Sequence, residues 1–207
     1  TLKTDYTNNQ KELIKNHVNY IINFIDYYNE TFKDKKSQAE IQKEILQTIE
    51  KLRVNQNPNE YIFIYDFNGK LIQDAVSKNN IGENFYNLKD INGKEVIKEL
   101  ITTSQKKHGG YVEYVWYKPE ISKQTNKISY SLSYNKWNWT IGKGVYLDEI
   151  DKLVKIKEEE FNQKISNYTL QITSLTIMLI LYSIFIYKNA TILIVNDVKE
   201  IGKYFKE

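Results

Sequence analysis

The chain has 207 residues, enough for one ordinary domain with appended helices, and its length alone does not justify a second core. Its 29 basic and 26 acidic residues intermingle and leave a net charge of +3, so no basic stripe can neutralise the phosphates of a nucleic acid. With no cysteine, the chain has no disulfide scaffold, thiolate zinc site or cysteine nucleophile.

Two amphipathic helices are predicted in residues 1–57. The first carries apolar residues at alternating intervals of 4 and 3, and it runs to about residue 34. A second helix, with apolar residues from Ile41 to Leu52, ends near Pro58, because proline disfavours helical geometry in the residue before it. The first stripe could be a core face, a coiled-coil seam between two copies, or both. Its members are Ile14, Val18, Ile21, Ile25, Tyr28 and Phe32.

From residue 61 the apolar pattern changes to that of strands. Residues 61–66 and 70–76 flank Asn68-Gly69, which readily takes the left-handed conformations of a two-residue hairpin turn. A helix over residues 94–106 follows, with Val96, Ile97, Leu100 and Ile101 at helical spacing. Three aromatic and β-branched runs, 110–119, 127–135 and 137–146, then predict an antiparallel meander separated by polar turns at 119–126 and 135–136.

The last third of the chain is predicted to enter a membrane. Residues 168–187 contain no Asp, Glu, Lys or Arg, and at about 1.5 Å per residue they span the roughly 30 Å hydrocarbon core. The alternative is a buried core helix, but no other segment is apolar enough to surround it. A secretion signal is rejected because the segment lies near the C-terminus. The polar start without methionine leads us to expect a first membrane helix before residue 1.

Three motifs together resemble a known family over about residues 50–151. They are Gly109-Gly110 before an aromatic strand, Tyr-x-Trp-x-Lys-Pro at residues 114–119, and Trp-x-Trp-x-Ile-Gly-x-Gly-Val-Tyr at residues 137–146. This pattern resembles the single Cache domains, which are extracytoplasmic sensor domains of bacterial transmembrane receptors. The chain departs from the pattern at Gln73-Asp74-Ala75, where many relatives carry His-Pro.

The resemblance implies a fold, a function and a location. The fold is α+β, with a long N-terminal helix, a PAS-like antiparallel sheet of about five strands, and a C-terminal helix running into a transmembrane helix. A small carboxylate such as acetate, propionate, pyruvate or lactate, or another small metabolite, binds on the sheet. The sensor lies in the periplasm or outside the cell on the bacterial inner (plasma) membrane, as a homodimer. A cytoplasmic histidine kinase, chemotaxis domain or diguanylate cyclase responds.

We therefore expect five regions along the chain: a helical stalk at 1–57, a ligand-binding Cache sheet at 58–150, an exit helix at 151–167, a membrane helix at 168–187 and the start of a signalling helix at 188–207. Lys188 and Lys199 after the membrane helix weakly favour a cytoplasmic C-terminus.

The strongest candidate binding residues are Tyr114, Trp116 and Lys118, which alternate along one strand and so share a face. Lysine supplies charge, tyrosine an oriented hydrogen bond, and tryptophan an N–H and exclusion of water. The alternative places Trp116 in the core and Lys118 at the solvent rim. The other candidates are Tyr61, Phe63 and Tyr65 on one neighbouring strand, Tyr130 on another with Ser129 or Lys127 as further options, and Arg53, which could meet a carboxylate or water.

No catalytic residue, cofactor or metal is expected. No nucleophile and base stand together in the pattern, and His17 and His108 lack the spacing of a metal site. Trp137, Trp139 and Tyr146 are assigned to the core. The sequence thus favours a ligand sensor, and its two alternatives are a dimerisation stalk without a ligand and a membrane-anchored enzyme.

Overall fold

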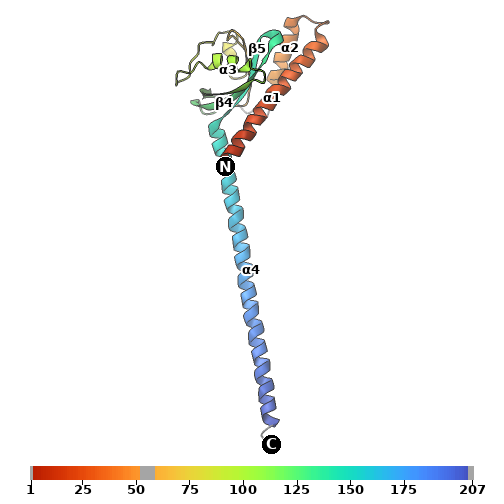
Figure 1. Cartoon of the computed structure of the whole chain (residues 1–207), viewed down its shortest axis with the longest axis vertical. Helices are drawn as coiled ribbons and strands as arrows, with labels where there is room; N and C mark the ends of the chain where they lie inside the picture. Colours follow the sequence, from red (N-terminus) through yellow and green to blue (C-terminus); the bar gives the residue numbers. More distant parts are fainter. Residues whose placement is uncertain (1, 52–58, 205–207) are drawn as a thin grey trace. The chain divides into compact units, whose positions relative to one another are not determined.

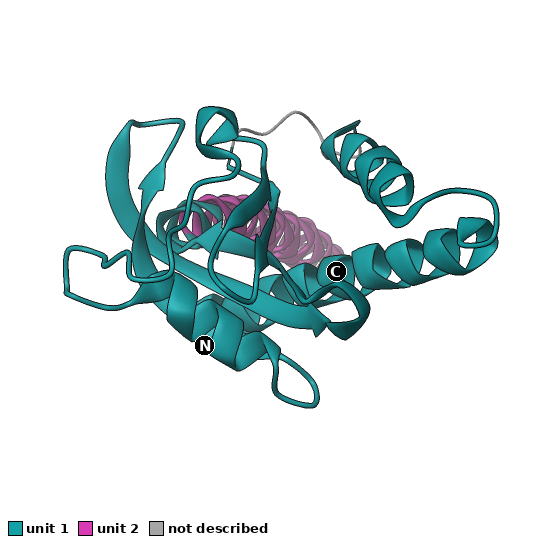
Figure 2. Cartoon of the chain, turned by 90° about the horizontal axis from the view of Figure 1, so that it is seen from above, with its two compact units in different colours: residues 1–154 teal, residues 155–207 magenta. Residues whose placement is uncertain are grey.

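The computed structural model describes residues 2–51 and 59–204. The chain divides into two compact units, residues 1–154 and 155–207, and the boundary falls inside the last helix (Figure 2). Figure 1 labels α1, α2, α3, α4, β4 and β5. The elements along the chain are α1 (Leu2–Phe32), α2 (Gln38–Lys51), β1 (Ile62–Asp66), β2 (Leu71–Asp74), η2 (Lys78–Asn80), α3 (Val96–Ser104), β3 (Gly110–Lys118), β4 (Lys123–Tyr134), η3 (Asn135–Trp137), β5 (Trp139–Tyr146) and α4 (Leu147–Tyr204).

The five strands form one antiparallel sheet in the order β2-β1-β5-β4-β3. The first hairpin therefore joins the meander through β1 and β5, with Phe63 opposite Gly142. A Cβ at Gly142 would overlap the Phe63 ring, so the glycine lets this ring lie flat across β5. The predicted α+β fold is confirmed, with its long N-terminal helix, five-stranded sheet and long apolar C-terminal helix.

Each face of the sheet packs against helices. On one face, α1 and α2 bury an apolar cluster that includes Ile14, Val18 and Ile25 together with Trp137 and Trp139. On the other face, α3 and the loops around it cover Phe63, Tyr65 and Tyr114. Residues 127–131 of β4 are all buried, because both faces of the strand are covered there. The helices expected as a stalk thus lie in the same compact unit as the sheet.

Strand β2 and helix α3 are shorter than predicted, and four residues rather than two connect β1 to β2, with Gly69 in the left-handed region at φ 87°. Two further boundaries differ from the sequence-based prediction. Helix α1 begins at Leu2, well before the first residue of the apolar stripe. Its first turns are polar and largely exposed, so the apolar pattern does not reveal them. Strand β4 begins at Lys123, inside the expected polar turn, because it pairs with β3 up to Lys118 opposite Lys123. The turn is tightened at Ser122, whose φ is 51°. The predicted end of α2 near Pro58, and Arg53, lie outside the described residues.

Helix α4 contains the expected membrane segment. Among the residues that the structure describes, one helix is long and apolar enough to cross a membrane, and it spans Leu147–Ile201. None of its most apolar window is buried, which argues against a core helix of a soluble domain. Its apolar side chains, from Leu170 to Ile186, are exposed along the whole window. This segment is a candidate transmembrane helix.

Candidate functional site

A small cavity lies on the α3 side of the sheet, and we refer to it as the cavity. Its volume is about 10 Å³, close to the space that one water molecule needs. Side chains from β1, β2, β3, β4 and α3, and one residue just before β1, form its walls. They are Tyr61, Phe63, Tyr65, Asp74, Ile97, Leu100, Tyr114, Trp116 and Lys127.

The pleat of the sheet brings these side chains together. Residues two apart on a strand share a face, so Phe63 joins Tyr65, and Tyr114 joins Trp116. Tyr114 lies opposite Lys127 in the β3–β4 pair, which sets the lysine beside the aromatic wall. Gly144 of β5 keeps this region open, since a Cβ there would lie 2.5 Å from Lys127 Cε. The Gly-x-Gly motif of β5 therefore clears room for the cavity side chains.

Lys127 is the buried cation of the cavity. Its side chain is 1% exposed, and its Nζ donates a hydrogen bond of 2.8 Å to the Tyr61 hydroxyl. The ammonium also lies 4.1 Å from the centre of the Tyr61 ring and 4.8 Å from that of Tyr146. Burial lowers the pKa of Lys127 to about 7, against the opposing charges of Asp74 and Glu149. The cavity thus holds an ammonium that is ready to lose its proton near neutral pH.

The cavity also contains a carboxylate, Asp74, at the end of β2. Its Oδ1 accepts hydrogen bonds from the backbone N–H groups of Val76, at 2.7 Å, and Ser77, at 3.0 Å. Asp74 is 3% exposed and fixes the turn that follows the strand. Burial raises the pKa of the Tyr61, Tyr65 and Tyr114 hydroxyls, with a further contribution from the Asp74 charge. These hydroxyls therefore stay protonated and can donate hydrogen bonds to a ligand oxygen.

Five of the eight candidate residues line the cavity, namely Tyr61, Phe63, Tyr65, Tyr114 and Trp116. Tyr130 lies on the opposite face, in the cluster under α1, where its hydroxyl donates to the His108 carbonyl at 2.6 Å. Tyr130 and Lys127 are three residues apart on β4, so one of them must point away from the cavity. From the sequence, Lys127 was named only as a further option beside Tyr130. Asp74, Ile97 and Leu100 were not predicted as binding residues. The β3–β4 pairing could have identified Lys127, because Lys127 lies opposite Tyr114 and residues opposite each other point to the same face of the sheet.

Lys118 lies at the end of β3 in a cluster of carboxylates rather than in the cavity wall. Its fully buried Nζ is 2.8 Å from Asp148 Oδ2, 3.2 Å from Glu149 Oε1 and 3.7 Å from Glu120 Oε2. Asn59 joins this group by donating to both glutamates, at 2.9 and 2.6 Å. We call these five residues the Lys118 cluster. Burial alone would lower the pKa of Lys118, but its bonds with Asp148 and Glu149 outweigh burial and raise it.

The Lys118 cluster and the cavity meet at Tyr146. The ring of this last β5 residue lies 5.4 Å from Lys118 Nζ and 4.8 Å from Lys127 Nζ. Its hydroxyl donates to the Tyr117 carbonyl at 2.6 Å. Leu147, the next residue, begins α4, and Asp148 lies in its first turn, where a carboxylate is favoured by the helix dipole. A path of direct contacts therefore links the cavity to the start of α4.

The described residues contain no group of three or more His, Cys, Asp or Glu side chains that could hold a metal ion. The arrangement combines one ammonium, neutral phenols and aromatic walls around a small space, together with the Asp74 carboxylate, whose Oδ1 is bonded to two backbone N–H groups. Such a site is suited to binding a small anion.

A long helix on one face of a five-stranded antiparallel sheet, with an aromatic cavity on the other face, defines a PAS-like sensor domain. Residues 6–160 match the model of the Single Cache domain 2 family, and the chain belongs to this family. The resemblance seen in the sequence motifs is thereby confirmed.

Curated relatives are receptors of two kinds. The chain is 40% identical over 90 residues to the sensor histidine kinase MctS of Rhizobium johnstonii, a match that covers 44% of this chain and 19% of that protein. It is 29% identical over 114 residues to the methyl-accepting chemotaxis protein McpP of Pseudomonas putida, covering 55% of this chain and 21% of that protein. The matched region is thus about a fifth of each relative.

Solved structures of the same kind are similar over most of the sensor unit. A methyl-accepting chemotaxis protein from Vibrio parahaemolyticus aligns with a TM-score of 0.62 and 28% identity, over 72% of this chain and 95% of that one. A Cache chemosensory domain, described as a structural basis for carboxylic acid recognition, aligns with a TM-score of 0.58 and 26% identity, over 68% of this chain and 92% of that one.

Proposed function

We propose that the chain senses a small carboxylate outside the cytoplasm and passes the signal through α4 to a cytoplasmic histidine kinase or chemotaxis domain. The observation that carries this proposal is Lys127, a buried ammonium in an aromatic cavity. Family membership and the carboxylic acid recognition described for one similar domain support it. In this proposal the described residues bind a ligand and catalyse no reaction.

The carboxylate would sit against Lys127, with hydrogen bonds from the neutral phenols of Tyr61 and Tyr114. The cavity has room for about one water, so a ligand must widen it, and a short acid requires the smallest displacement of the walls. Asp74 lies in the same wall and would meet a hydroxyl or ammonium next to the ligand carboxylate. We therefore expect lactate or a small amino acid to bind better than a dicarboxylate, whose second charge faces Asp74.

A thermal stability screen tests the proposal. Acetate, propionate, pyruvate, lactate, small amino acids and succinate are added to the full chain in detergent, and unfolding of the sensor unit is followed by near-UV circular dichroism. A ligand at about 100 times its Kd adds about 2.7 kcal/mol of stability, which corresponds to a rise in Tm of about 5–10 °C. Lys127→Met should remove the shift. Lys143→Met, a buried lysine on the other face, should keep it. No shift with any compound would favour the dimerisation stalk.

We further propose that the chain lies in the bacterial inner (plasma) membrane, with residues 1–154 in the periplasm or outside the cell. The candidate transmembrane helix and the lysines that follow it support this orientation. Because the chain has no cysteine, a single Tyr117→Cys on exposed β3 reports one side cleanly. In intact cells this cysteine should react with a membrane-impermeant maleimide, and Lys199→Cys should react only after lysis. The reverse pattern would contradict the orientation.

The homodimer remains a proposal, and its face on α1 needs revision. The stripe that contains Ile14, Val18 and Ile25 is buried in the core of one subunit. A different stripe faces solvent: Leu13 is 42%, Tyr20 68% and Tyr27 71% exposed. These residues recur every seven positions, so they occupy one position of a heptad repeat. We propose that two copies pack through this second stripe.

A further inference from the structure

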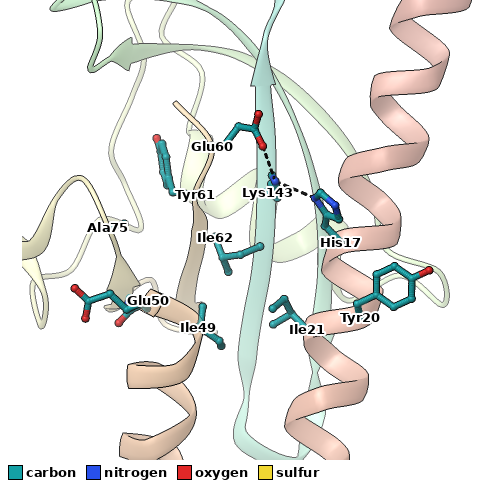
Figure 3. A pocket seen from close by; sticks show the side chains of 11 residues that line it. His17, Tyr20, Ile21, Ile49, Glu50, Glu60, Tyr61, Ile62, Ala75 and Lys143 are labelled. Carbon is teal, nitrogen blue, oxygen red and sulfur yellow. Dashed lines mark hydrogen bonds and ion pairs between the residues drawn. The ribbon is translucent and has the colours of Figure 1, made fainter. Parts of the chain in front are cut away.

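The face of the sheet under α1 and α2 carries a second and larger pocket, which the proposed carboxylate site does not use and whose rim includes Tyr20 of the proposed dimer stripe. We call it the groove. It lies between α1, α2 and the β1, β2 and β5 strands, and its volume is about 170 Å³ (Figure 3). An apolar cavity of about 150 Å³ is known to hold a benzene molecule. The groove is therefore of the size of a small ring compound, whereas the cavity on the other face is not.

The walls of the groove are largely apolar. Ile21 of α1, Ile49 of α2 and Ile62 of β1 converge on it, and Ala75 lies in its wall near the end of β2 (Figure 3). Tyr61, just before β1, also borders the groove. Aliphatic side chains beside a flat ring give a ligand dispersion contacts and remove its apolar surface from water. These walls favour the body of an uncharged ring compound.

One end of the groove is polar. Lys143 Nζ lies 2.9 Å from His17 Nδ1 and 3.1 Å from Glu60 Oε2, and the lysine is 7% exposed (Figure 3). Burial and the Lys143 charge lower the pKa of His17, so its imidazole is neutral and accepts at Nδ1. This end thus offers N–H donors and a carboxylate acceptor within one small group.

The charges that line the groove balance. Lys143 pairs with Glu60, and Glu50 pairs with Lys78. An anion would find no uncompensated cation there, and a cation no uncompensated carboxylate. A hydroxyl group, in contrast, can accept from Lys143 and donate to Glu60 at the same time.

We propose that the groove is a second ligand site, for a small uncharged aromatic compound that carries one hydroxyl group, such as phenol. The ring lies among Ile21, Ile49 and Ile62, and the hydroxyl meets Lys143 and Glu60. Tyr61 borders both the groove and the cavity, and its hydroxyl accepts from Lys127. The two sites therefore share one side chain, but binding in the groove does not require the carboxylate site to exist.

Isoleucine methyl spectra of the full chain in amphipol test this site with phenol as the probe. Saturable shifts are expected for Ile21, Ile49 and Ile62, while Ile97 and Ile101 on the α3 side stay in place. Toluene, which lacks the hydroxyl, should bind several-fold more weakly, and benzoate should give no saturable shift. Because the readout is direct, it can succeed even if every carboxylate fails in the thermal screen, and the reverse also holds.

Two variants that fill the groove from different sides keep the test decisive. Ala75→Leu and Ile21→Phe should each weaken phenol binding at least tenfold. If one of the two variants does not fold, the other still tests the proposal. Lys143→Met should bring phenol and toluene to similar affinity. The proposal is overturned if phenol shifts stay linear or spread to all methyl groups, if both filled variants bind phenol normally, or if benzoate or an aromatic amine binds more tightly than phenol.

Discussion

The two buried lysines near Tyr146 should have separable roles, and Lys118→Met is the sharpest test. Methionine keeps the length and apolar volume of the side chain and removes only the charge. In the wild-type chain, Asp148, Glu149 and Glu120 lie within 2.8, 3.2 and 3.7 Å of the ammonium. Without it, three carboxylates face one another around Asn59. Lys118→Met should therefore lower stability and leave ligand affinity within a few-fold.

The size of this loss follows from burial. Removing one partner of a fully buried ion pair costs about 3–5 kcal/mol. Here Lys118 is fully buried, but the side chains of Asp148, Glu149 and Glu120 are 33%, 21% and 49% exposed, so water can solvate part of the charge that is left. We expect a loss of about 2 kcal/mol, equivalent to a fall in Tm of about 4–8 °C for a domain of this size.

Thermal unfolding and carboxylate titration of the same samples separate the two roles. Lys123→Met is the matched control, because Lys123 lies opposite Lys118 in the β3–β4 pair and is exposed. It should change Tm by less than about 1 °C, since exposed charges contribute little. If Lys118→Met abolished carboxylate binding at unchanged Tm, Lys118 would belong to the ligand site, as the sequence pattern first indicated.

Three further predictions concern the cavity and the dimer. Burial lowers the pKa of Lys127 to about 7 from 10.5, so the unfolded chain holds an extra proton between these values. The free energy of unfolding should therefore rise from about pH 7 to pH 10 while carboxylate affinity falls, and Lys127→Met should flatten both profiles in titrations and melts. Gly144→Ala should abolish carboxylate binding and lower Tm, because its Cβ would lie 2.5 Å from Lys127 Cε; normal calorimetric affinity would contradict the packing. Tyr20→Asp with Tyr27→Asp should yield monomers in light scattering, whereas Tyr117→Asp should not, and a persistent dimer would exclude this stripe.

The fold could be predicted because its signals are local. Period-two runs, the Asn68-Gly69 turn and the 4-and-3 spacing of α1 each specify an element without reference to the rest of the chain. What α1 packs against could not be predicted in this way. Helical spacing shows that Ile14 and Val18 share a face, but a core and a dimer seam demand the same face. The structure assigns these residues to the core and leaves Leu13 and Tyr20 exposed.

The cavity could be predicted only in part, because β4 is covered on both faces. A strand with one solvated face alternates apolar and polar residues, and that alternation shows which side chains point inward. On β4, Tyr130 lies in the cluster under α1 and Ile128 has the same parity, while Lys127 and Ser129 face the cavity side, and all four are buried. The sequence therefore led to the prediction of Tyr130 as a binding residue, although its polar neighbours Lys127 and Ser129 lie on the cavity side. A buried lysine is a stronger sign of a site than a buried tyrosine, since only the lysine needs a partner to stay charged.

Tyr146 explains why a cavity this small can influence α4. Its ring contacts both lysines, and the helix begins at the next residue. In the proposed function, a carboxylate that draws the Lys127 ammonium toward itself would weaken the cation–π contact with Tyr146 and would change the packing beside Lys118. The ion pair of Lys118 with Asp148 would carry that change to the first turn of α4. A ligand shifts such an equilibrium only by its differential affinity for the two arrangements, about 1–3 kcal/mol in coupled sites. We therefore expect only small displacements at the first turn of α4 when a ligand binds.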